Sequence, residues 1–238
     1  MLGTSDFTDE IRKVKRVVPD LPILCDADTG FLSIELTVKE FWTAGASGFH
    51  IEDQVFPKKC GHLQGKQLIS QDDMVEKVHV ACDARDRLTD KQFVVCARTD
   101  ARSVTGIEEA IERGLAYADA GADMLFPEGL HNFKEFNTYS SAIRKRNDKV
   151  HLLANLTEFG VTDLQSITIV GLEAAGYSCV IYPVSTLRVS LKAADDLLDT
   201  IKIEKTQTGD IPDMYTREQL YKLLDYDPNS TEKWKYKK

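Results

Sequence analysis

The sequence lacks the signals that would place a protein in a membrane, in a secretory route or on a nucleic acid. No apolar run approaches the roughly 18 residues of a membrane-spanning helix. The N-terminus has no basic region followed by an apolar core, which is the pattern of a secretory signal. A net charge of -8 argues against a general nucleic-acid surface, because phosphate binding needs a basic face. A small anionic substrate remains compatible with this composition, since it responds to local charge.

Paired cysteines and two common catalytic motifs are also missing. There is no CxxC pair, no Gly-x-Ser-x-Gly elbow and no phosphate-binding P-loop. The five cysteines are odd in number and widely spaced, which favours a reducing compartment. We therefore expect a cytoplasmic protein, with a mitochondrial location as the alternative if a presequence preceded Met1.

Short apolar runs alternate with longer amphipathic segments along the chain. The runs are continuous rather than alternating, as in strands that a parallel sheet buries on both faces. The predicted strands are Pro22–Asp26, Gly48–Glu52, Phe93–Arg98, Asp123–Pro127, Val150–Asn155 and Cys179–Pro183. The predicted helices are Ile34–Ala44, Ser70–Arg87, Gly106–Ala120, Phe133–Arg146, Thr162–Ala174, Leu187–Lys202 and Thr216–Leu224. Six consecutive strand–helix units predict a parallel sheet with helices outside.

Polar residues follow the carboxyl ends of all six predicted strands. Ligands bind at this edge in parallel α/β folds. A doubly wound sheet usually has few functional strand ends and one Gly-rich loop, so this distribution favours a (β/α)8 barrel. The residues are Asp26, Asp28, Glu52, Asp53, Arg98, Asp100, Glu128, Asn155, Thr157 and Arg188.

Acidic residues predict a cation site at this edge. Asp26 and Asp28 can both reach one hard cation, and magnesium favours such oxygen ligands. The alternative is a helix N-cap beside a surface carboxylate. Glu52 adds a carboxylate on the next strand, and several neighbouring acids repel one another unless a cation neutralises them. We therefore predict Mg2+.

The segment Lys58-Lys59-Cys60-Gly61-His62 is the strongest candidate for reactive chemistry. Nearby cations stabilise a thiolate by lowering the pKa of the thiol. The competing interpretation is a polar surface loop with an incidental cysteine. The position of this segment, directly after a strand that ends in acids, favours a catalytic loop.

The remaining strand ends offer groups that could hold a substrate carboxylate, each with a structural alternative. Arg98 can pair with a carboxylate in a bidentate manner or form a salt bridge to a neighbouring acid. Glu128 is either a supporting metal carboxylate or part of an ion pair at the rim. Asn155 and Thr157 can donate hydrogen bonds, although Thr157 also suits a helix N-cap. Arg188 suits an anion or a solvated face.

Six motifs, in this order, resemble the isocitrate lyase/phosphoenolpyruvate mutase superfamily. They are DADTGF, HIEDQVFPKKCGH, ARTDA, ADMLFPEG, LLANLTEFG and IYPVSTLR. The resemblance covers nearly the whole chain and is strongest to the 2-methylisocitrate lyase branch. It implies a (β/α)8 TIM barrel and magnesium-dependent cleavage of 2-methylisocitrate to pyruvate and succinate. Isocitrate lyase and oxaloacetate hydrolase activities are the alternatives within the superfamily.

The resemblance also implies residue roles. Asp26 and Asp28 correspond to the metal carboxylates, and Cys60 to the thiol that protonates the carbanion left when succinate departs. The other catalytic positions implied are Lys58, His62 and Glu52. The substrate-binding positions implied are Gly61, Arg98, Glu128, Asn155, Thr157, Arg188 and Arg217. A homotetramer formed by exchange of C-terminal helices is implied as well.

The chain departs from the family pattern at its start, because the opening strand–helix–strand has no counterpart here. We predict a partial β/α barrel over residues 1–208, lacking the first two strands, and a C-terminal helical extension over residues 209–238. Such a barrel leaves two sheet edges unpaired and its core open. An inactive homologue that acts as a partner subunit is therefore a second hypothesis for the function.

Overall fold

The computed structural model describes residues 2–158 and 160–228, so the last ten residues of the predicted C-terminal extension lie outside the described residues. The chain forms two compact units, residues 1–183 and 184–238. The first unit contains the sheet and the candidate site, and each unit is described by itself. The predicted domain boundary after residue 208 stays a prediction. No described helix is both long and apolar enough to cross a membrane.

A six-stranded parallel sheet forms the centre of the first unit. Its strands follow one another in chain order, so each strand pairs with the next one along the sequence. Within the described residues, β1 pairs only with β2 and β6 only with β5, which confirms the predicted partial barrel with two unpaired edges. The strands are β1 Leu24–Asp26, β2 Gly48–Glu52, β3 Val94–Thr99, β4 Met124–Pro127, β5 His151–Asn155 and β6 Cys179–Ile181.

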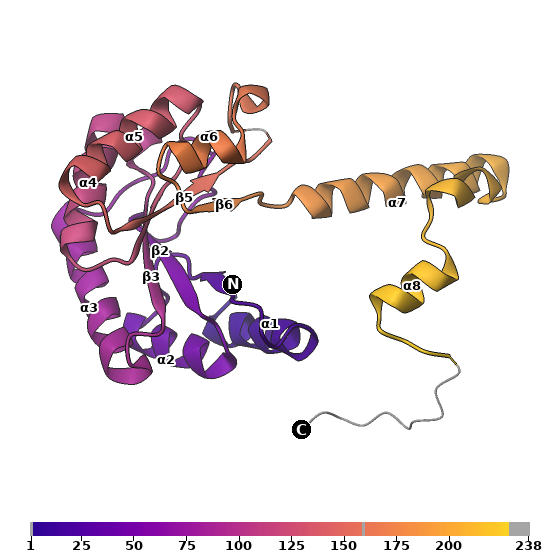
Figure 1. Cartoon of the computed structure of the whole chain (residues 1–238), viewed down its shortest axis with the longest axis horizontal. Coiled ribbons are helices and arrows are strands. Elements are labelled where there is room, and N and C mark those ends of the chain that lie inside the picture. Colours follow the sequence, from indigo (N-terminus) through magenta and orange to yellow (C-terminus); the bar gives the residue numbers. More distant parts are fainter. Residues whose placement is uncertain (1, 159, 229–238) are drawn as a thin grey trace. The chain divides into compact units, whose positions relative to one another are not determined.

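Helices cover one side of this sheet, and Figure 1 shows α2 to α5 in an arc around its outer face. The helices of this unit are α1 Thr4–Val17, α2 Ile34–Ala44, α3 Gln71–Thr89, α4 Ile107–Asp119, α5 Phe133–Arg146 and α6 Ile169–Ala174. Two 3-10 turns, η1 Ala101–Ser103 and η2 Leu164–Ser166, precede α4 and α6. The element order is that of repeated right-handed strand–helix units.

The two faces of the sheet have different contents. Phe49, Ile51, Val95 and Leu125 point to the helices and belong to the large core cluster. The residues between them point to the inner face, where Cys96, Phe126 and Leu153 form a small apolar cluster. We call these the outer face and the inner face. Strand alternation therefore separates a helix-covered core from a small inner cluster that lies below the charged strand ends.

Serine side chains cap the starts of α2 and α3. The hydroxyl of Ser33 accepts from the backbone of Leu36 at 3.3 Å, and that of Ser70 from Asp73 at 3.0 Å. Each cap satisfies an amide that has no partner within the helix. The helix α2 ends at Gly45, whose φ of 104° lies in the left-handed region that glycine adopts at low cost.

The predicted elements agree with the structure except near the start and around α6. The helix α1 was not predicted, because charged residues dominate the segment and only Phe7 and Ile11 mark its buried side. The predicted helix Thr162–Ala174 is shorter than expected and begins at Ile169, where Thr168 caps it. The alternative interpretation of Thr157 as a helix N-cap is therefore wrong, since none of the helices within residues 2–158 and 160–228 starts directly after it.

The second unit consists of α7 Ser185–Glu204, the 3-10 turn η3 Thr208–Asp213 and α8 Arg217–Leu223. Thr216 and Gln219 form a reciprocal capping box at the start of α8. Neither helix buries a residue. The turn η3 was not predicted, because Pro212 within it argues against a regular helix.

Candidate active site

The strand register places charged residues side by side on the inner face. Asp26 of β1 lies opposite His50 of β2, and Glu52 of β2 lies opposite Arg98 of β3. Because parallel strands all run the same way, their carboxyl ends form one edge, and the loops that follow meet above it. The sequence therefore brings acids and an arginine to one end of the inner face.

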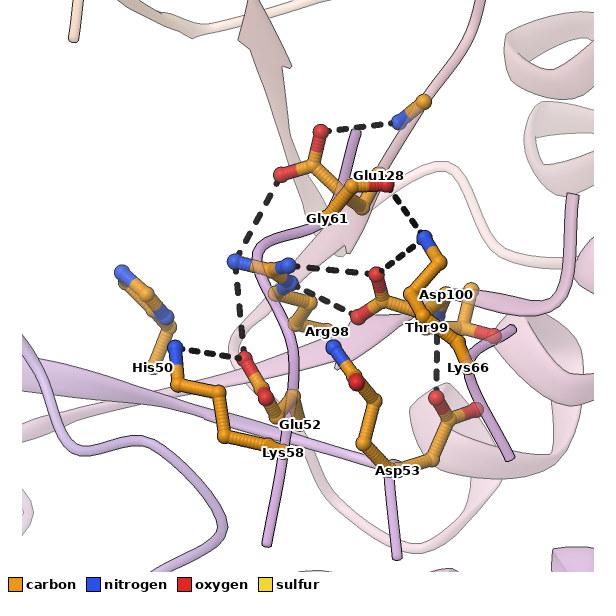
Figure 2. A network of polar contacts seen from close by, with 12 residues as sticks. His50, Glu52, Asp53, Lys58, Gly61, Lys66, Arg98, Thr99, Asp100 and Glu128 are labelled. Atoms are coloured by element: carbon orange, nitrogen blue, oxygen red, sulfur yellow. Dashed lines mark hydrogen bonds and ion pairs between the residues drawn. The ribbon is translucent and has the colours of Figure 1, made fainter. Parts of the chain in front are cut away.

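Arg98 is the centre of a buried ionic cluster (Figure 2). Its guanidinium donates to both oxygens of Asp100, at 2.9 and 3.1 Å. One terminal nitrogen lies 3.5 Å from Glu52 and 3.5 Å from Glu128. The guanidinium also lies over the ring of Phe126, 5.2 Å from its centroid. Three carboxylates thus share one guanidinium group at this end of the inner face.

The carboxyl group of Glu52 has an unusually high pKa. Both carboxylate oxygens are buried and make no hydrogen bond, although Lys58 Nζ lies 3.7 Å from one of them. Burial raises the pKa of Glu52 to about 7, against the opposing effects of Arg98 and Lys58. Glu52 is thus a carboxyl group that can exchange a proton near neutral pH.

A loop over residues 55–67 covers this cluster, and we call it the thiol loop because it carries Cys60. Cys60 is exposed, whereas Gly61 beside it is buried. A Cβ atom added to Gly61 would lie 2.5 Å from Cγ of Glu128 and 2.6 Å from a nitrogen of Arg98. The backbone of the loop tip therefore touches the ionic cluster, and only glycine allows so close an approach. This contact places the residue directly after Cys60 against the cluster.

Two further residues of the thiol loop reach acids of the sheet edge. Lys58 Nζ lies 2.6 Å from Asp28, and His62 Nε2 lies 3.2 Å from Glu128. These contacts come from opposite sides of Cys60 in the sequence. Lys58, Gly61 and His62 thus contact acids of the sheet edge, whereas the side chain of Cys60 between them is exposed. Their catalytic roles remain proposals.

Asn155 and Thr157 close another side of the cluster. The amide of Asn155 donates to the two oxygens of Glu128 at 3.3 and 3.2 Å, and its carbonyl oxygen is buried without a hydrogen-bond partner. Thr157 is buried as well. The unpaired oxygen of Asn155 and the unpaired oxygens of Glu52 are polar atoms that a bound molecule could satisfy.

Asp26, Asp28 and Glu52 are carboxylates of the kind that magnesium uses as ligands. The Lys58 ammonium group lies near both Asp28 and Glu52, so these carboxylates already require a positive charge. Among the described residues there is no group of three His, Cys, Asp or Glu side chains placed to hold a metal by itself. Magnesium commonly uses one or two carboxylates and completes its shell with water and substrate. The alternative interpretation of Asp26 and Asp28, a helix N-cap beside a surface carboxylate, is wrong in its first part, since Ser33 caps α2.

Arg188 and Arg217 belong to the second unit. Arg188 lies in the first turn of α7, and Arg217 is the first residue of α8. Their predicted contact with a substrate carboxylate stays a prediction.

Two residues of the site were not assigned a role from the sequence, Lys66 and Gln54. Lys66 is buried and donates to Asp100 at 2.7 Å, and the side chain of Gln54 bonds to both backbone groups of Lys59. Gln54 lies directly before the thiol loop, and Lys66 lies near its C-terminal end. Their contacts with Asp100 and Lys59 depend on how the loop folds back, and neither the spacing nor the periodicity of the sequence predicts that fold.

The whole chain is similar to known lyases. The family model described as phosphoenolpyruvate phosphomutase matches residues 2–202. A 2-methylisocitrate lyase from Aeropyrum pernix is 47% identical over 92% of this chain and 67% of its own length. The 2-methylisocitrate lyase of Halalkalibacterium halodurans is 43% identical over 95% of this chain and 73% of its own length.

Solved structures share the fold. Oxaloacetate acetylhydrolase in complex with 3,3-difluorooxalacetate superposes with a TM-score of 0.83 at 30% identity, covering 94% of this chain and 74% of that chain. A 2,3-dimethylmalate lyase superposes with a TM-score of 0.81 at 30% identity, covering 94% of this chain and 72% of that chain. The charged edge of the sheet, the thiol loop and these similarities lead to one assignment: the chain belongs to the phosphoenolpyruvate mutase/isocitrate lyase superfamily.

Proposed function

We propose that this protein is a magnesium-dependent carbon–carbon lyase that cleaves 2-methylisocitrate to pyruvate and succinate. The observation that carries the proposal is the close approach of Gly61, the residue directly after Cys60, to Arg98 and Glu128. The identity of 43–47% to 2-methylisocitrate lyases supports this substrate over others of the superfamily.

The reaction breaks the bond between the hydroxyl-bearing carbon and the adjacent carbon that becomes part of succinate. The hydroxyl proton passes to a base, and the oxygen becomes the carbonyl oxygen of pyruvate. The electron pair of the broken bond stays on the succinate fragment, which must then take up one proton. The site therefore needs one group that accepts a proton and one that donates a proton.

Glu52 and Cys60 are the groups that suit these two tasks. Glu52 is buried at the charged edge and its pKa of about 7 allows it to accept the hydroxyl proton, directly or through a water molecule. The Sγ–H of Cys60 would donate to the succinate fragment. The ammonium group of Lys58 and a hydrogen bond from His62, both close to Cys60 in the sequence, would stabilise the resulting thiolate until it is protonated again.

The remaining groups would bind and orient the substrate. Arg98 and the backbone amide of Gly61 are suited to a carboxylate, and the unpaired oxygen of Asn155 to a hydroxyl. Thr157, Arg188 and Arg217 complete the proposed set, with Glu128 orienting His62 and Asn155. A magnesium ion held by Asp26 and Asp28 would supply positive charge for the negative charge that develops on the oxo-acid product.

A second copy of the chain is part of the proposal. None of the twenty residues of α7 is buried, and several of them are large and apolar. An apolar surface of this kind is typical of helices that pack in an oligomer. We propose a homo-oligomer, with a tetramer as the expected state, which light scattering of the purified protein would test. The exposed apolar residues are Leu187, Val189, Leu191, Leu198, Ile201 and Ile203.

A substrate panel tests the activity. Purified protein is assayed with 2-methylisocitrate, isocitrate and oxaloacetate, each with Mg2+ and with a chelator. We expect kcat/KM for 2-methylisocitrate to be about 10- to 200-fold above that for isocitrate, the discrimination that one methyl group in an apolar pocket provides. Preference for oxaloacetate would change the substrate assignment. No turnover of any substrate would contradict the proposal and support a partner subunit without activity.

A further inference from the structure

The thiol loop is closed at its base by backbone hydrogen bonds. Val55 donates to Gln67 at 2.8 Å, and Ile69 donates to Asp53 at 2.9 Å. Gln54 and Leu68 form an antiparallel bridge between these bonds. The two ends of the loop are therefore fixed to each other, and the position of the tip depends on contacts made farther along.

The tip is held from inside the loop by Lys66. The ammonium group of Lys66 donates to the carbonyl oxygen of Gly61 and to Asp100 Oδ1 (Figure 2). Only 1% of the Lys66 side chain is exposed, and Asp100 is fully buried. A buried ammonium group needs such partners, because an unpaired charge in the interior is strongly unfavourable.

The Asp100 carboxylate also fixes Arg98. Its two oxygens accept the hydrogen bonds from the Arg98 guanidinium, and its backbone amide donates to Asp53 at 2.9 Å. Burial alone would raise the pKa of Asp100, but Arg98 and Lys66 outweigh it and hold the pKa below its usual value. One ionised carboxylate thus connects the arginine of the site to the lysine that holds the loop tip.

We infer that Lys66 is a positioning residue that latches the tip of the thiol loop onto the Asp100–Arg98 pair. The latch acts on the backbone carbonyl of the residue directly after Cys60, so it fixes where the thiol lies relative to the charged edge. The relevance for catalysis rests on the proposed function, in which Cys60 donates a proton. Displacement of a catalytic group by about 1 Å can cost on the order of 100-fold in rate.

Lys66→Met removes the ammonium group and keeps the length of the side chain. Two lysine variants provide the comparison. Lys66→Arg keeps a cation that can donate to both acceptors, and Lys59→Met removes an exposed lysine of the same loop whose one contact, to the Gln64 carbonyl, is 3.4 Å long. Gly61→Ala is a separate way to lift the tip, because the added Cβ would collide with Glu128 while the Lys66–Asp100 pair remains.

Hydrogen exchange of the thiol-loop amides reports how firmly Lys66 holds the loop tip, and it needs no substrate. The amide of Lys59 donates to the side chain of Gln54 at 3.0 Å, and the amide of Leu63 donates to the Cys60 carbonyl at 2.9 Å. We expect exchange in a peptide covering residues 55–67 to be at least tenfold faster in Lys66→Met and in Gly61→Ala, with strand β3 unchanged. Lys59→Met and Lys66→Arg should exchange within about threefold of the wild type. If Lys66→Met does not fold, the exchange rates of Lys66→Arg and Gly61→Ala still test whether these contacts hold the loop tip in position.

Steady-state kinetics of the same variants test whether the position of the loop tip affects catalysis. We expect Lys66→Met to lower kcat by about 10- to 100-fold and to change KM by less than about threefold, with partial recovery in Lys66→Arg. If the loop of Lys66→Met exchanged at the wild-type rate, or if exchange in β3 were accelerated as much as in the loop, the positioning role of Lys66 would be contradicted. If the wild type itself turns over no substrate, the proposed function fails while the exchange result still decides the role of Lys66.

Discussion

The outer and inner faces of one sheet are filled in different ways. On the outer face, Phe49, Ile51 and Leu125 are fully buried against the helices. On the inner face, the apolar cluster around Cys96, Phe126 and Leu153 is small, and several residues packed against it remain partly exposed. Charged residues lie above it. The same strands thus provide stability on one side and chemistry on the other.

The difference explains where polar groups are tolerated. A buried charge is costly unless it is paired, and the inner face pairs Arg98 with three acids at its open end. On the outer face the strand residues Phe49, Ile51 and Leu125 meet the core cluster. Buried charge on that side is paired as well, since Asp53 after β2 lies 3.3 Å from Arg113 of α4. We therefore expect substitutions on the outer face to change stability, and those on the charged edge to change activity as well.

The largest expected effect is that of Arg98→Met. Loss of the guanidinium leaves Glu52, Asp100 and Glu128 without their shared cation, which should lower the free energy of unfolding by about 3–5 kcal/mol and abolish turnover. Arg102→Met is the matched control, because Arg102 pairs with Glu135 in a partly exposed position. It should cost no more than about 1 kcal/mol. Urea unfolding measures both, and equal losses would contradict the special position of Arg98.

A matched pair of leucines compares the two faces directly. Leu152 is fully buried on the outer face, and Leu24 is partly buried beside the inner cluster of the edge strand β1. Leu152→Ala should lower the free energy of unfolding by about 2–5 kcal/mol, since it leaves a cavity in a close-packed core. Leu24→Ala should cost about 1 kcal/mol, because less apolar surface is lost from burial. Similar values in urea unfolding would mean that the inner face is as well filled as the outer face.

A smaller effect, and one that depends on pH, is expected for Glu52→Gln. Because the pKa of Glu52 in the folded protein is raised to about 7, the folded state binds the proton more tightly than the unfolded state. Wild-type stability from this group is fully present below its unfolded pKa and is lost as the pH rises through about 7. Glu52→Gln cannot ionise, so its stability relative to wild type should increase between pH 5 and pH 8 by on the order of 1–3 kcal/mol. Thermal unfolding in a chelator measures this, and a difference independent of pH would contradict the raised pKa.

The sequence was sufficient for the sheet and for the grouping of the charged residues. Continuous apolar runs identified all six strands, and parallel order then implied that Asp26, Glu52 and Arg98 share one edge. The helix α1 was missed because Phe7 and Ile11 become a buried side only when Phe31 and Phe41 pack against them. Local patterning cannot anticipate a partner that is distant in the sequence.

The contacts of the thiol loop were less predictable. Its motif named Lys58, Cys60, Gly61 and His62, yet nothing in the spacing indicated that Lys66 turns back to Gly61 and Asp100. Likewise, the alternatives that gave a helix N-cap to the Asp26/Asp28 pair and to Thr157 were settled only by the structure, in which Ser33 caps α2 and Thr168 caps α6. Loop conformation depends on side chains that meet in space, and these have no periodic signature in the sequence.

The most direct measurement compares succinate formation from 2-methylisocitrate and Mg2+ by the wild type, Cys60→Ser and Cys82→Ser. Cys82 lies on the outer side, on α3, where its thiol donates to the Gly121 carbonyl at 3.1 Å, a bond that a serine hydroxyl can replace. If Cys60 is the proton donor, Cys60→Ser should be slower by about 100- to 10,000-fold, the usual contribution of a general acid, and Cys82→Ser should match the wild type. Equal rates for the wild type and Cys60→Ser would contradict the role of the thiol loop.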